Sequence, residues 1–237
     1  MNPTRAHIGI VACSAEGAAL CYRTICIEGA RLLGGHAHPE VSLHSHSLAD
    51  YVARLERGDL DGVGALMLSS AGKLAKTGAD FLICPDNTIH AAFGFVEQRS
   101  PLPWLHIAEV VAEEARAKGY QRPAITGTKW LVDSEVYPGK LRAFGLDFRR
   151  PRPDDRDLID RIIMDELVHG VFDKGSTARM LDIIARFKSE EGCDAVVLGC
   201  TELPLVIGDE NSPLPVLDST RLLARAALQR AVDTSGK

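Results

Sequence analysis

The sequence predicts an α/β protein made of two similar lobes, each a parallel sheet flanked by helices. Short apolar runs that end in Gly, Pro or small residues alternate with longer segments of helical period, which is the pattern of parallel strands covered by helices. A set of short motifs also occurs twice in the same order. We expect residues 1–100 and 211–237 to form the first lobe and residues 101–210 the second.

The predicted elements follow from these two periodicities. Compact apolar runs predict strands at 7–12, 41–45, 81–84, 104–107, 124–127, 195–198 and 215–217. Apolar residues that recur every three or four positions predict helices between them, such as those at 18–33, 107–118, 157–171, 177–190 and 219–232. No low-complexity linker separates the two halves.

An internal repeat supports the two-lobed fold. Residues 78–88 match 192–202 at an offset of 114, and both segments begin with a glycine and continue to an aspartate. The same offset places 8–14 on 122–128. The Ser-Pro-Leu-Pro segments that begin at Ser100 and Ser212 match at an offset of 112. Three matches in the same order argue against a chance resemblance.

The repeat makes Asp86 and Cys200 equivalent, each just past an apolar strand. Ligands of open parallel sheets bind beyond the carboxyl ends of the strands. We therefore expect an active site in the cleft between the lobes, with Asp86 and Cys200 directed at the substrate from opposite sides. That geometry suits proton transfer by two bases.

Composition narrows the classes of partner. The chain has 237 residues and a net charge of −5, so it lacks the basic excess that nucleic acid or an anionic membrane would require. The N-terminal segment lacks the apolar core of a signal peptide, and no apolar run reaches transmembrane length. The six cysteines stand singly in apolar stretches. These features predict a reduced, cytoplasmic protein that acts on small molecules.

Cys200 is the cysteine best placed for chemistry. A thiolate can take a proton from carbon and the thiol can return one, and a free cysteine titrates near pH 8.5. Cys200 follows Gly199 at a strand end, and Thr201 and Glu202 come where a helix or turn would begin and expose backbone N–H groups to an anionic carboxylate. We predict that the other five cysteines are inert core thiols: Cys13, Cys21, Cys26, Cys84 and Cys193.

Several motifs resemble those of the aspartate/glutamate racemase superfamily over nearly the whole chain. The segments 8–17, 86–90, 127–130 and 137–141 are similar to its opening turn, first catalytic motif and middle segment. Leu-Gly-Cys-Thr-Glu-Leu at 198–203 is similar to its second catalytic motif. The resemblance implies an amino-acid racemase that works without pyridoxal phosphate, other cofactor or metal, on an amino-acid or dicarboxylate substrate, as a homodimer.

The resemblance also implies roles for individual residues. Cys200 would be one of two bases that flank the α-carbon, and side-chain and backbone donors would hold the substrate carboxylate. In the family a lysine often follows the segment that corresponds to 166–172, where it pairs with an acidic substrate; here that position is Asp173 or Lys174. The residues expected to bind substrate are Ser14, Asn87, Thr88, Thr128, Lys174, Thr201 and Glu202.

Asp86 departs from the family pattern, which has cysteine at this position. Reference pKa values of about 3.9 for Asp and 8.5 for Cys make an unperturbed Asp86 a weaker base by roughly 6 kcal/mol of proton affinity. Burial beside a substrate carboxylate would reduce this gap. Two hypotheses stay open. In the first, Asp86 and Cys200 transfer protons at opposite faces of the substrate α-carbon. In the second, Asp86 only orients substrate in a one-cysteine decarboxylase or cis-trans isomerase. A non-catalytic two-lobed binding protein is the third reading.

The histidines offer no familiar metal motif. His36 and His38, like His44 and His46, alternate along the chain, but they lie around a loop and an edge strand without cysteine or carboxylate ligands at usual spacings. His90 follows Asn-Thr and either orients the first motif or caps its helix; the sequence leaves both open.

Overall fold

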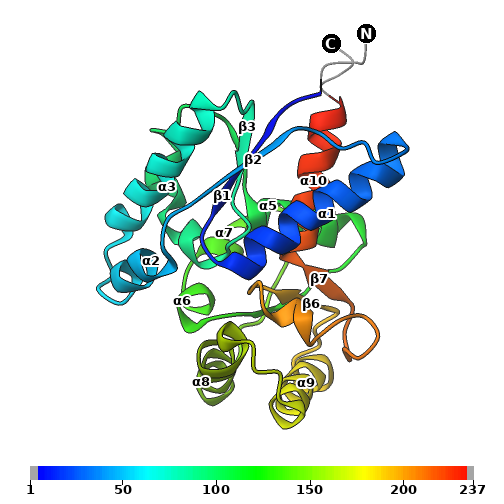
Figure 1. Ribbon diagram of the computed structural model, residues 1–237. Helices are drawn as coiled ribbons and strands as arrows, with labels where there is room; N and C mark the ends of the chain where they lie inside the picture. Colours follow the sequence, from blue (N-terminus) through cyan, green and yellow to red (C-terminus); the bar gives the residue numbers. More distant parts are fainter. Residues whose placement is uncertain (1–4, 234–237) are drawn as a thin grey trace. The chain divides into compact units, whose positions relative to one another are not determined.

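The computed structural model describes residues 5–233, which form two compact units (Figure 1). One unit comprises residues 5–107 and 220–233, and the other comprises residues 108–219. Each contains a single parallel sheet with helices on its faces, as the sequence predicts. The expected α/β class is thus confirmed.

The first unit has a four-stranded sheet in the order β2-β1-β3-β4. Its strands are β1 (Ile8–Ala12), β2 (Val41–Ser45), β3 (Phe81–Ile83) and β4 (Trp104–Leu105). Its helices are α1 (Ala15–Leu33), α2 (Leu48–Leu55), α3 (Leu60–Lys76), α4 (Phe93–Glu97), the 3-10 helix η1 (Thr88–Ala92) and all but the first residue of α10 (Ser219–Asp233).

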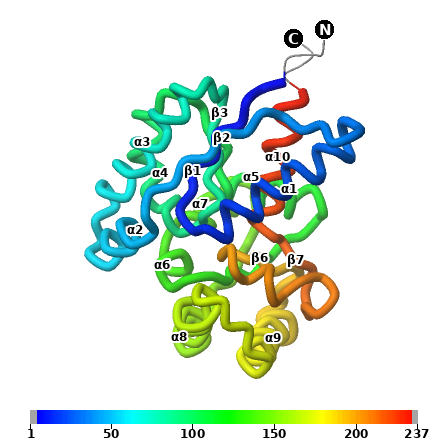
Figure 2. Tube along the Cα trace, viewed as in Figure 1, coloured from blue at the N-terminus to red at the C-terminus, as the bar shows by residue number. Residues whose placement is uncertain are grey.

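Helices cover both faces of this first sheet (Figures 1 and 2). Side chains alternate along each strand, so each face of the sheet has its own side chains to pack against these helices. Val11 and Leu82 pack in one apolar core with Met67 of α3. On the other face the guanidinium of Arg230, from α10, lies 4.7 Å from the ring centroid of Phe81. The strands therefore read as continuous apolar runs, as expected of a sheet buried on two sides.

The second unit has a three-stranded sheet in the order β5-β6-β7. Its strands are β5 (Pro123–Thr126), β6 (Ala195–Leu198) and β7 (Val216–Asp218). Its helices are all but the first residue of α5 (Ile107–Ala117), α6 (Lys129–Val132), α7 (Val136–Ala143), α8 (Pro153–Arg161), α9 (Lys174–Ser189) and the 3-10 helix η4 (Leu203–Leu205).

The internal repeat is confirmed by the strand pairing. β1-β3-β4 and β5-β6-β7 have the same order, and the pairs Leu82–Trp104 and Val196–Val216 reproduce the offsets of 114 and 112. The first strands differ slightly, because Ile8 pairs with Phe81 while Pro123 pairs with Ala195. This register gives β1 and β5 an offset of 115, one residue more than the sequence alignment.

The repeated residues have matching structural roles. Asp80 accepts a hydrogen bond from His7 N–H at 2.6 Å, and Asp194 accepts one from Arg122 N–H at 3.0 Å. Each aspartate therefore forms a hydrogen bond with the residue just before the first strand of its unit, β1 or β5. The preceding glycines of both repeats adopt positive φ, +89° at position 78 and +65° at 192. The two serines of the Ser-Pro-Leu-Pro segments make the same turn bonds, as Ser100 and Ser212 each donate to the carbonyl two residues on.

The strand pairing divides the chain differently from the sequence analysis at both crossovers. β4 adds to the first sheet beside β3, whereas residues 101–107 were assigned to the second lobe. β7 adds to the second sheet beside β6, whereas residues 211–219 were assigned to the first. The reason is the same in both halves: the Ser-Pro-Leu-Pro segment carries the last strand of its own sheet.

One predicted helix is broken. Residues 157–171 form the end of α8, a π-helical turn at Ile162–Glu166 and a 3-10 turn at Leu167–His169. Helix α8 begins earlier than expected because Pro153 suits the first turn. Gly170 ends the segment in a left-handed conformation with φ of +72°.

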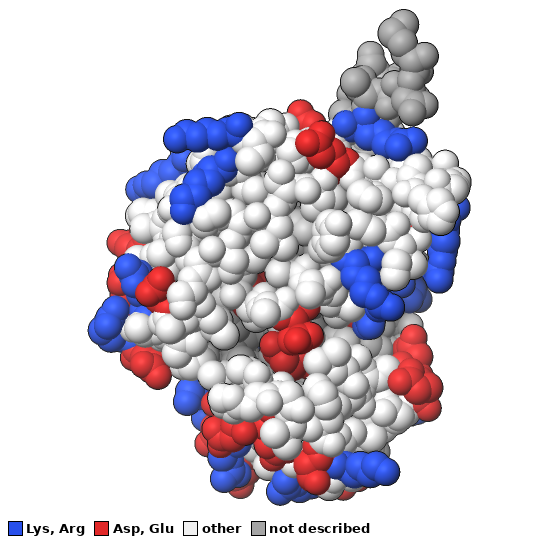
Figure 3. Space-filling model, viewed as in Figure 1, with Lys and Arg blue, Asp and Glu red and all other residues white. Residues whose placement is uncertain are grey.

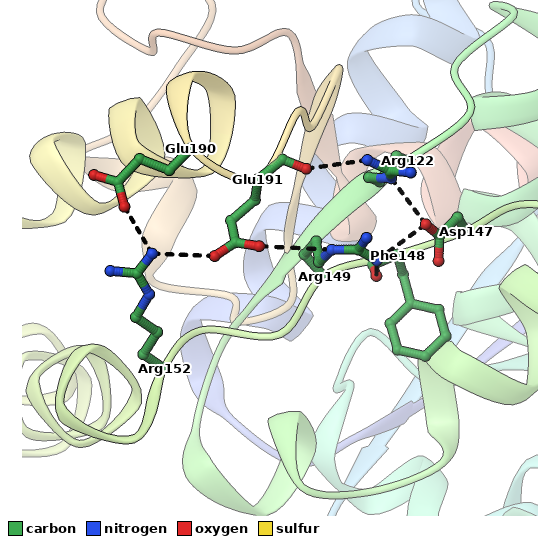
Figure 4. A network of polar contacts seen from close by, with 7 residues as sticks. All are labelled: Arg122, Asp147, Phe148, Arg149, Arg152, Glu190 and Glu191. Atoms are coloured by element: carbon green, nitrogen blue, oxygen red, sulfur yellow. Dashed lines mark hydrogen bonds and ion pairs between the residues drawn. The ribbon is translucent and has the colours of Figure 1, made fainter.

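Charged residues form local networks on the second unit. In Figure 4 the Arg149 side chain connects its loop to the turn that follows α9, because it contacts Glu191 at 3.6 Å, and it also contacts Asp147 of its own loop at 2.9 Å. Arg152 extends the network to Glu190 at 2.6 Å. On the face drawn in Figure 3, described basic side chains occur in separate groups among acidic ones.

No helix within residues 5–233 is long and apolar enough to cross a membrane.

Candidate active site

In the second unit, the motif after β6 places a thiol beside a buried carboxylate. Cys200 Sγ donates to Glu202 Oε2 at 2.9 Å, and Thr201 Oγ1 donates to the same oxygen at 2.7 Å. Cys200 is 8% exposed and Glu202 is 4% exposed. The Cys200 thiol is thus buried and has the Glu202 carboxyl group as its acceptor.

The chemistry of this pair follows from hydrogen bonding. A thiolate is the basic form of cysteine, and the thiol must transfer its proton to reach it. Hydrogen bonds to an ionised acceptor are stronger than neutral ones. The hydrogen bond to the Glu202 carboxyl group therefore holds the thiol in a fixed direction. The sequence did suggest a turn here, and η4 begins at Leu203.

Gly199 permits the close packing that brings Cys200 to the end of β6. Its N–H donates to Thr126 O at 2.9 Å. A Cβ atom built on Gly199 would lie 2.5 Å from that carbonyl oxygen and 2.5 Å from the Leu131 side chain. Only glycine fits this position without a shift of the β5 backbone.

Gly199→Ala should therefore lower the free energy of unfolding by about 1–3 kcal/mol, the usual cost of overpacking. The measurement is denaturant unfolding followed by circular dichroism. Gly139→Ala is the matched control in the same unit, because a Cβ there meets nothing within 4 Å and alanine favours the helix. Equal stability of the two variants would contradict the packing argument.

In the first unit, Asp86 caps the short helix that follows β3. Its Oδ1 accepts the Ile89 N–H at 3.2 Å, and its backbone oxygen accepts His90 Nδ1–H at 2.6 Å. The side chain of Asp86 is half-buried, while Asn87 is 2% exposed. His90, for which two roles were left open, contacts the backbone of the motif through its ring nitrogen.

Cys84 is a buried thiol without catalytic surroundings. Its Sγ lies 3.9 Å from Asp86 O, and its side chain is fully buried. Burial, and then the negative charge of Asp86, hold the pKa of Cys84 well above its ordinary value. The pKa of Tyr51 is raised in the same core, first by burial and then by the neighbouring Cys84 and Cys13 thiols. Cys84 therefore matches the predicted inert thiol.

Ser14 and Thr128, expected to line the site, are helix caps. Ser14 Oγ accepts Gly17 N–H at 3.2 Å at the start of α1, and Thr128 Oγ1 accepts Leu131 N–H at 3.3 Å at the start of α6. These matching caps follow the first strand of each repeat. Both hydroxyls thus have a structural role before any substrate is considered.

The remaining predicted residues fall into two groups. Asn87 and Thr88 follow Asp86 directly, at the start of η1 in the first unit. Lys174 is the exposed first residue of α9 in the second unit. The adjacent Asp173 caps that helix by accepting Ser176 N–H at 2.8 Å, a bond that lowers the Asp173 pKa. The motif residues therefore cluster within each unit, and Lys174 lies on a separate element.

Metal ligands do not assemble in the described part of the chain: residues 5–233 hold no group of three or more His, Cys, Asp or Glu that could bind an ion. His44 instead receives a hydrogen bond from Lys73 Nζ at 2.9 Å and contacts Ser70 Oγ at 2.9 Å. Partial burial, and then the charge of Lys73, lower the pKa of His44.

Thiol reactivity should separate the cysteines outside the motif. Burial raises the pKa of Cys193 to about 11, so at pH 9 only about 1% of this group is thiolate. Cys26, which the sequence analysis placed among the inert core thiols, is instead half-buried on α1. Iodoacetamide at pH 9 should therefore label Cys26 and leave Cys193 intact, as peptide mass spectrometry can measure. Labelling of Cys193 as fast as Cys26 in native protein, with unfolded protein as the control, would contradict the assignment.

Sequence reasoning missed two contacts. It assigned Glu202 to substrate binding and did not pair it with Cys200, although their separation of two residues was a usable signal. It also gave no sign that His90 Nε2 accepts the Ile107 N–H at 3.5 Å, because this contact depends on the approach of β4 to η1.

The repeated parallel sheets and the thiol and carboxylate at equivalent strand ends define a class of two-lobed α/β protein suited to proton transfer. The comparison with known families then identifies the group. The model of the Asp/Glu/hydantoin racemase family matches residues 10–227, so this chain belongs to that family.

Relatives and solved structures agree with this assignment. The broad-specificity amino-acid racemase RacX of Bacillus subtilis is 24% identical over 172 residues, which span 72% of this chain and 73% of RacX. Glutamate racemase of Pseudomonas paraeruginosa is 30% identical over 78% of this chain and 66% of its own length. PH1733, an aspartate racemase homologue from Pyrococcus horikoshii, is 26% identical, with a TM-score of 0.81 over 98% of this chain and 99% of PH1733.

Proposed function

We propose that the protein is a cofactor-independent amino-acid racemase that inverts the α-carbon by proton transfer between two bases, Cys200 and Asp86. The observation that carries the proposal is the hydrogen bond from the Cys200 thiol to the buried Glu202 carboxylate, at the end of β6. Asp86 occupies the equivalent place after β3, as the repeat requires. The family and the named relatives support a racemase reaction.

In one direction the Cys200 thiolate takes the α-proton and Asp86 delivers its own proton to the opposite face of the planar carbanion. The carbon–hydrogen bond breaks on one side and forms on the other, so no oxidant or reductant is needed. Glu202 then accepts a hydrogen bond from the new S–H group, as it does in this structure. The reverse direction uses the same groups with their roles exchanged.

Substrate binding is proposed to rest on the residues beside the two bases. Asn87 and Thr88 would donate to the substrate carboxylate from η1, and Thr201 would contribute its backbone N–H, because its hydroxyl already donates to Glu202. Glu202 thereby serves the thiol rather than the substrate. Lys174 would pair with an acidic side chain. We further propose a cytoplasmic homodimer that acts on free amino acids.

Proton exchange in D2O tests the proposal. The protein is incubated with a panel of single-enantiomer amino acids, including aspartate and glutamate, and loss of the α-hydrogen signal is followed by NMR while chiral chromatography measures inversion. Exchange together with inversion is the expected result. A protein that exchanges no α-hydrogen in the whole panel would refute the racemase.

A second candidate function follows from Asp86 itself. Its carboxylate accepts the Ile89 N–H, so it has a structural role that needs no proton transfer. A decarboxylase or cis-trans isomerase in which Cys200 alone acts is then the alternative. Turnover of a substituted malonate or of maleate without α-hydrogen exchange would favour it. Binding of these compounds without turnover would favour a non-catalytic binding protein.

A further inference from the structure

The chain passes between its units at two equivalent residues. Ile107 is the last residue of the first unit before the crossover, and Ser219 is the last residue of the second. They are 112 residues apart, which is the offset of the Ser-Pro-Leu-Pro repeat, and they begin α5 and α10. Each is hydrogen-bonded within its own unit to the motif that carries a proposed proton carrier.

In the first unit the link passes through the His90 ring. Ile107 N–H donates to His90 Nε2 at 3.5 Å, and His90 Nδ1 lies 2.6 Å from Asp86 O. A backbone N–H can only donate and a carbonyl can only accept. One neutral tautomer, with the proton on Nδ1, therefore satisfies both contacts and connects Asp86 to the crossover.

Packing fixes the orientation of this ring. His90 is 3% exposed. Phe93 stacks on it with ring centroids 5.6 Å apart, and His106 meets it edge-on at 4.7 Å. A buried ring held on two sides cannot turn without disturbing its neighbours. The position of the Asp86 backbone is thus set by the ring as well as by its own helix.

In the second unit the link is direct. Ser219 Oγ donates to Leu198 O at 2.7 Å, and the serine is fully buried. Leu198 is the last residue of β6, two residues before Cys200. The phenol of Tyr137 packs beside Ser219 and Asp218 in the same core. The strand end that carries the thiol is therefore fastened to the second crossover.

We infer that His90 and Ser219 are positioning residues, which fasten Asp86 and Cys200 respectively to the two crossovers at Ile107 and Ser219. The inference rests on the proposed two-base reaction. Each residue acts through a backbone carbonyl and touches no reacting atom. Loss of one link should therefore impair the proton carrier of that unit and spare the other, a pattern that general destabilisation would not produce.

The test compares exchange with inversion in D2O for both enantiomers of the best substrate. His90→Phe keeps ring volume but removes both contacts, and inversion should fall by about 100-fold, the usual cost of a misplacement near 1 Å. Exchange of the enantiomer whose α-hydrogen faces Cys200 should stay near wild type. His90→Asn, which keeps an N–H donor, should restore part of the inversion. Ser219→Ala should show the mirror pattern, with loss of exchange at the Cys200 face.

Trp104→Phe is the control, because Trp104 belongs to the same aromatic cluster through Phe93 but bonds instead to Ser100. It should leave the ratio of exchange to inversion unchanged. Equal loss of exchange and inversion in His90→Phe, or unchanged inversion, would overturn the inference. Circular dichroism and thermal unfolding verify that each variant is folded.

Nitrogen NMR of histidine-labelled protein tests the link without turnover. The expected His90 spectrum has a protonated Nδ1 and a bare Nε2, and the opposite tautomer would overturn the inference. A wild-type protein that exchanges no amino acid would refute the proposed function, and the nitrogen spectrum would still decide the His90 link.

Discussion

Replacement of Cys200 by serine should lower the rate of racemisation by about 10³-fold or more, within the range for loss of a general acid or base. A serine hydroxyl gives up its proton far less readily than a thiol, so the proton cannot be taken from the Cys200 face. Glu202 would keep a hydroxyl donor, which preserves the local hydrogen bond. Polarimetry or chiral chromatography measures the rate.

The control for this prediction is Cys193→Ser, a buried thiol of the same unit outside the motif. It should retain activity within a few-fold when compared at equal folded concentration, because its thiol has no proposed catalytic role. An inversion rate within tenfold of wild type in Cys200→Ser would show that the thiol is not a proton carrier. The proposed two-base reaction would then be wrong.

Replacement of Asp86 by asparagine should lower the rate of inversion by about 10²–10⁴-fold, while α-hydrogen exchange from the Cys200 face persists. The amide oxygen can still accept the Ile89 N–H, and the backbone bond to His90 is untouched, so the local structure is retained. Only the ability to carry a proton is removed. The measurement is NMR exchange combined with chiral chromatography.

Asp86→Cys supplies the complementary variant, because it introduces the thiol that the resemblance of residues 86–90 to the first catalytic motif leads us to expect at this position. We expect it to racemise at least as fast as wild type, since a thiolate is a stronger base than a carboxylate. Full inversion in Asp86→Asn would exclude Asp86 as a required proton carrier. Loss of exchange at both faces in that variant would instead assign Asp86 to substrate binding.

The repeat illustrates how far sequence reasoning reaches. The alignment of 78–88 with 192–202 placed Asp86 and Cys200 at equivalent strand ends, and the pairing of β3 with β4 and of β6 with β7 bears out its offsets. Strand identity follows from local apolar runs, which need no knowledge of distant contacts. The same reasoning assigned β4 and β7 to the wrong sheets, because pairing partners are set by contacts that lie far apart in sequence.

The site shows the same boundary between local and distant information. The types of residue at the two motifs, and their order along the chain, could be read directly from the sequence. The role of Glu202 depends on side-chain direction, and the burial of Cys200 depends on the core around β6. The link from His90 to Ile107 depends on how η1 approaches the end of β4. These are tertiary properties.

The sequence by itself thus determined the α/β class, the twofold repeat, the family and the positions of the thiol and carboxylate. Periodicity and short motifs record these features residue by residue. The tertiary structure alone decided that Cys200 is buried, that β4 pairs with β3 and β7 with β6, and that both crossovers are bonded to the motifs. Hydrogen-bond partners are chosen by distance and direction in the folded chain, and those quantities exist only after packing has fixed the backbone.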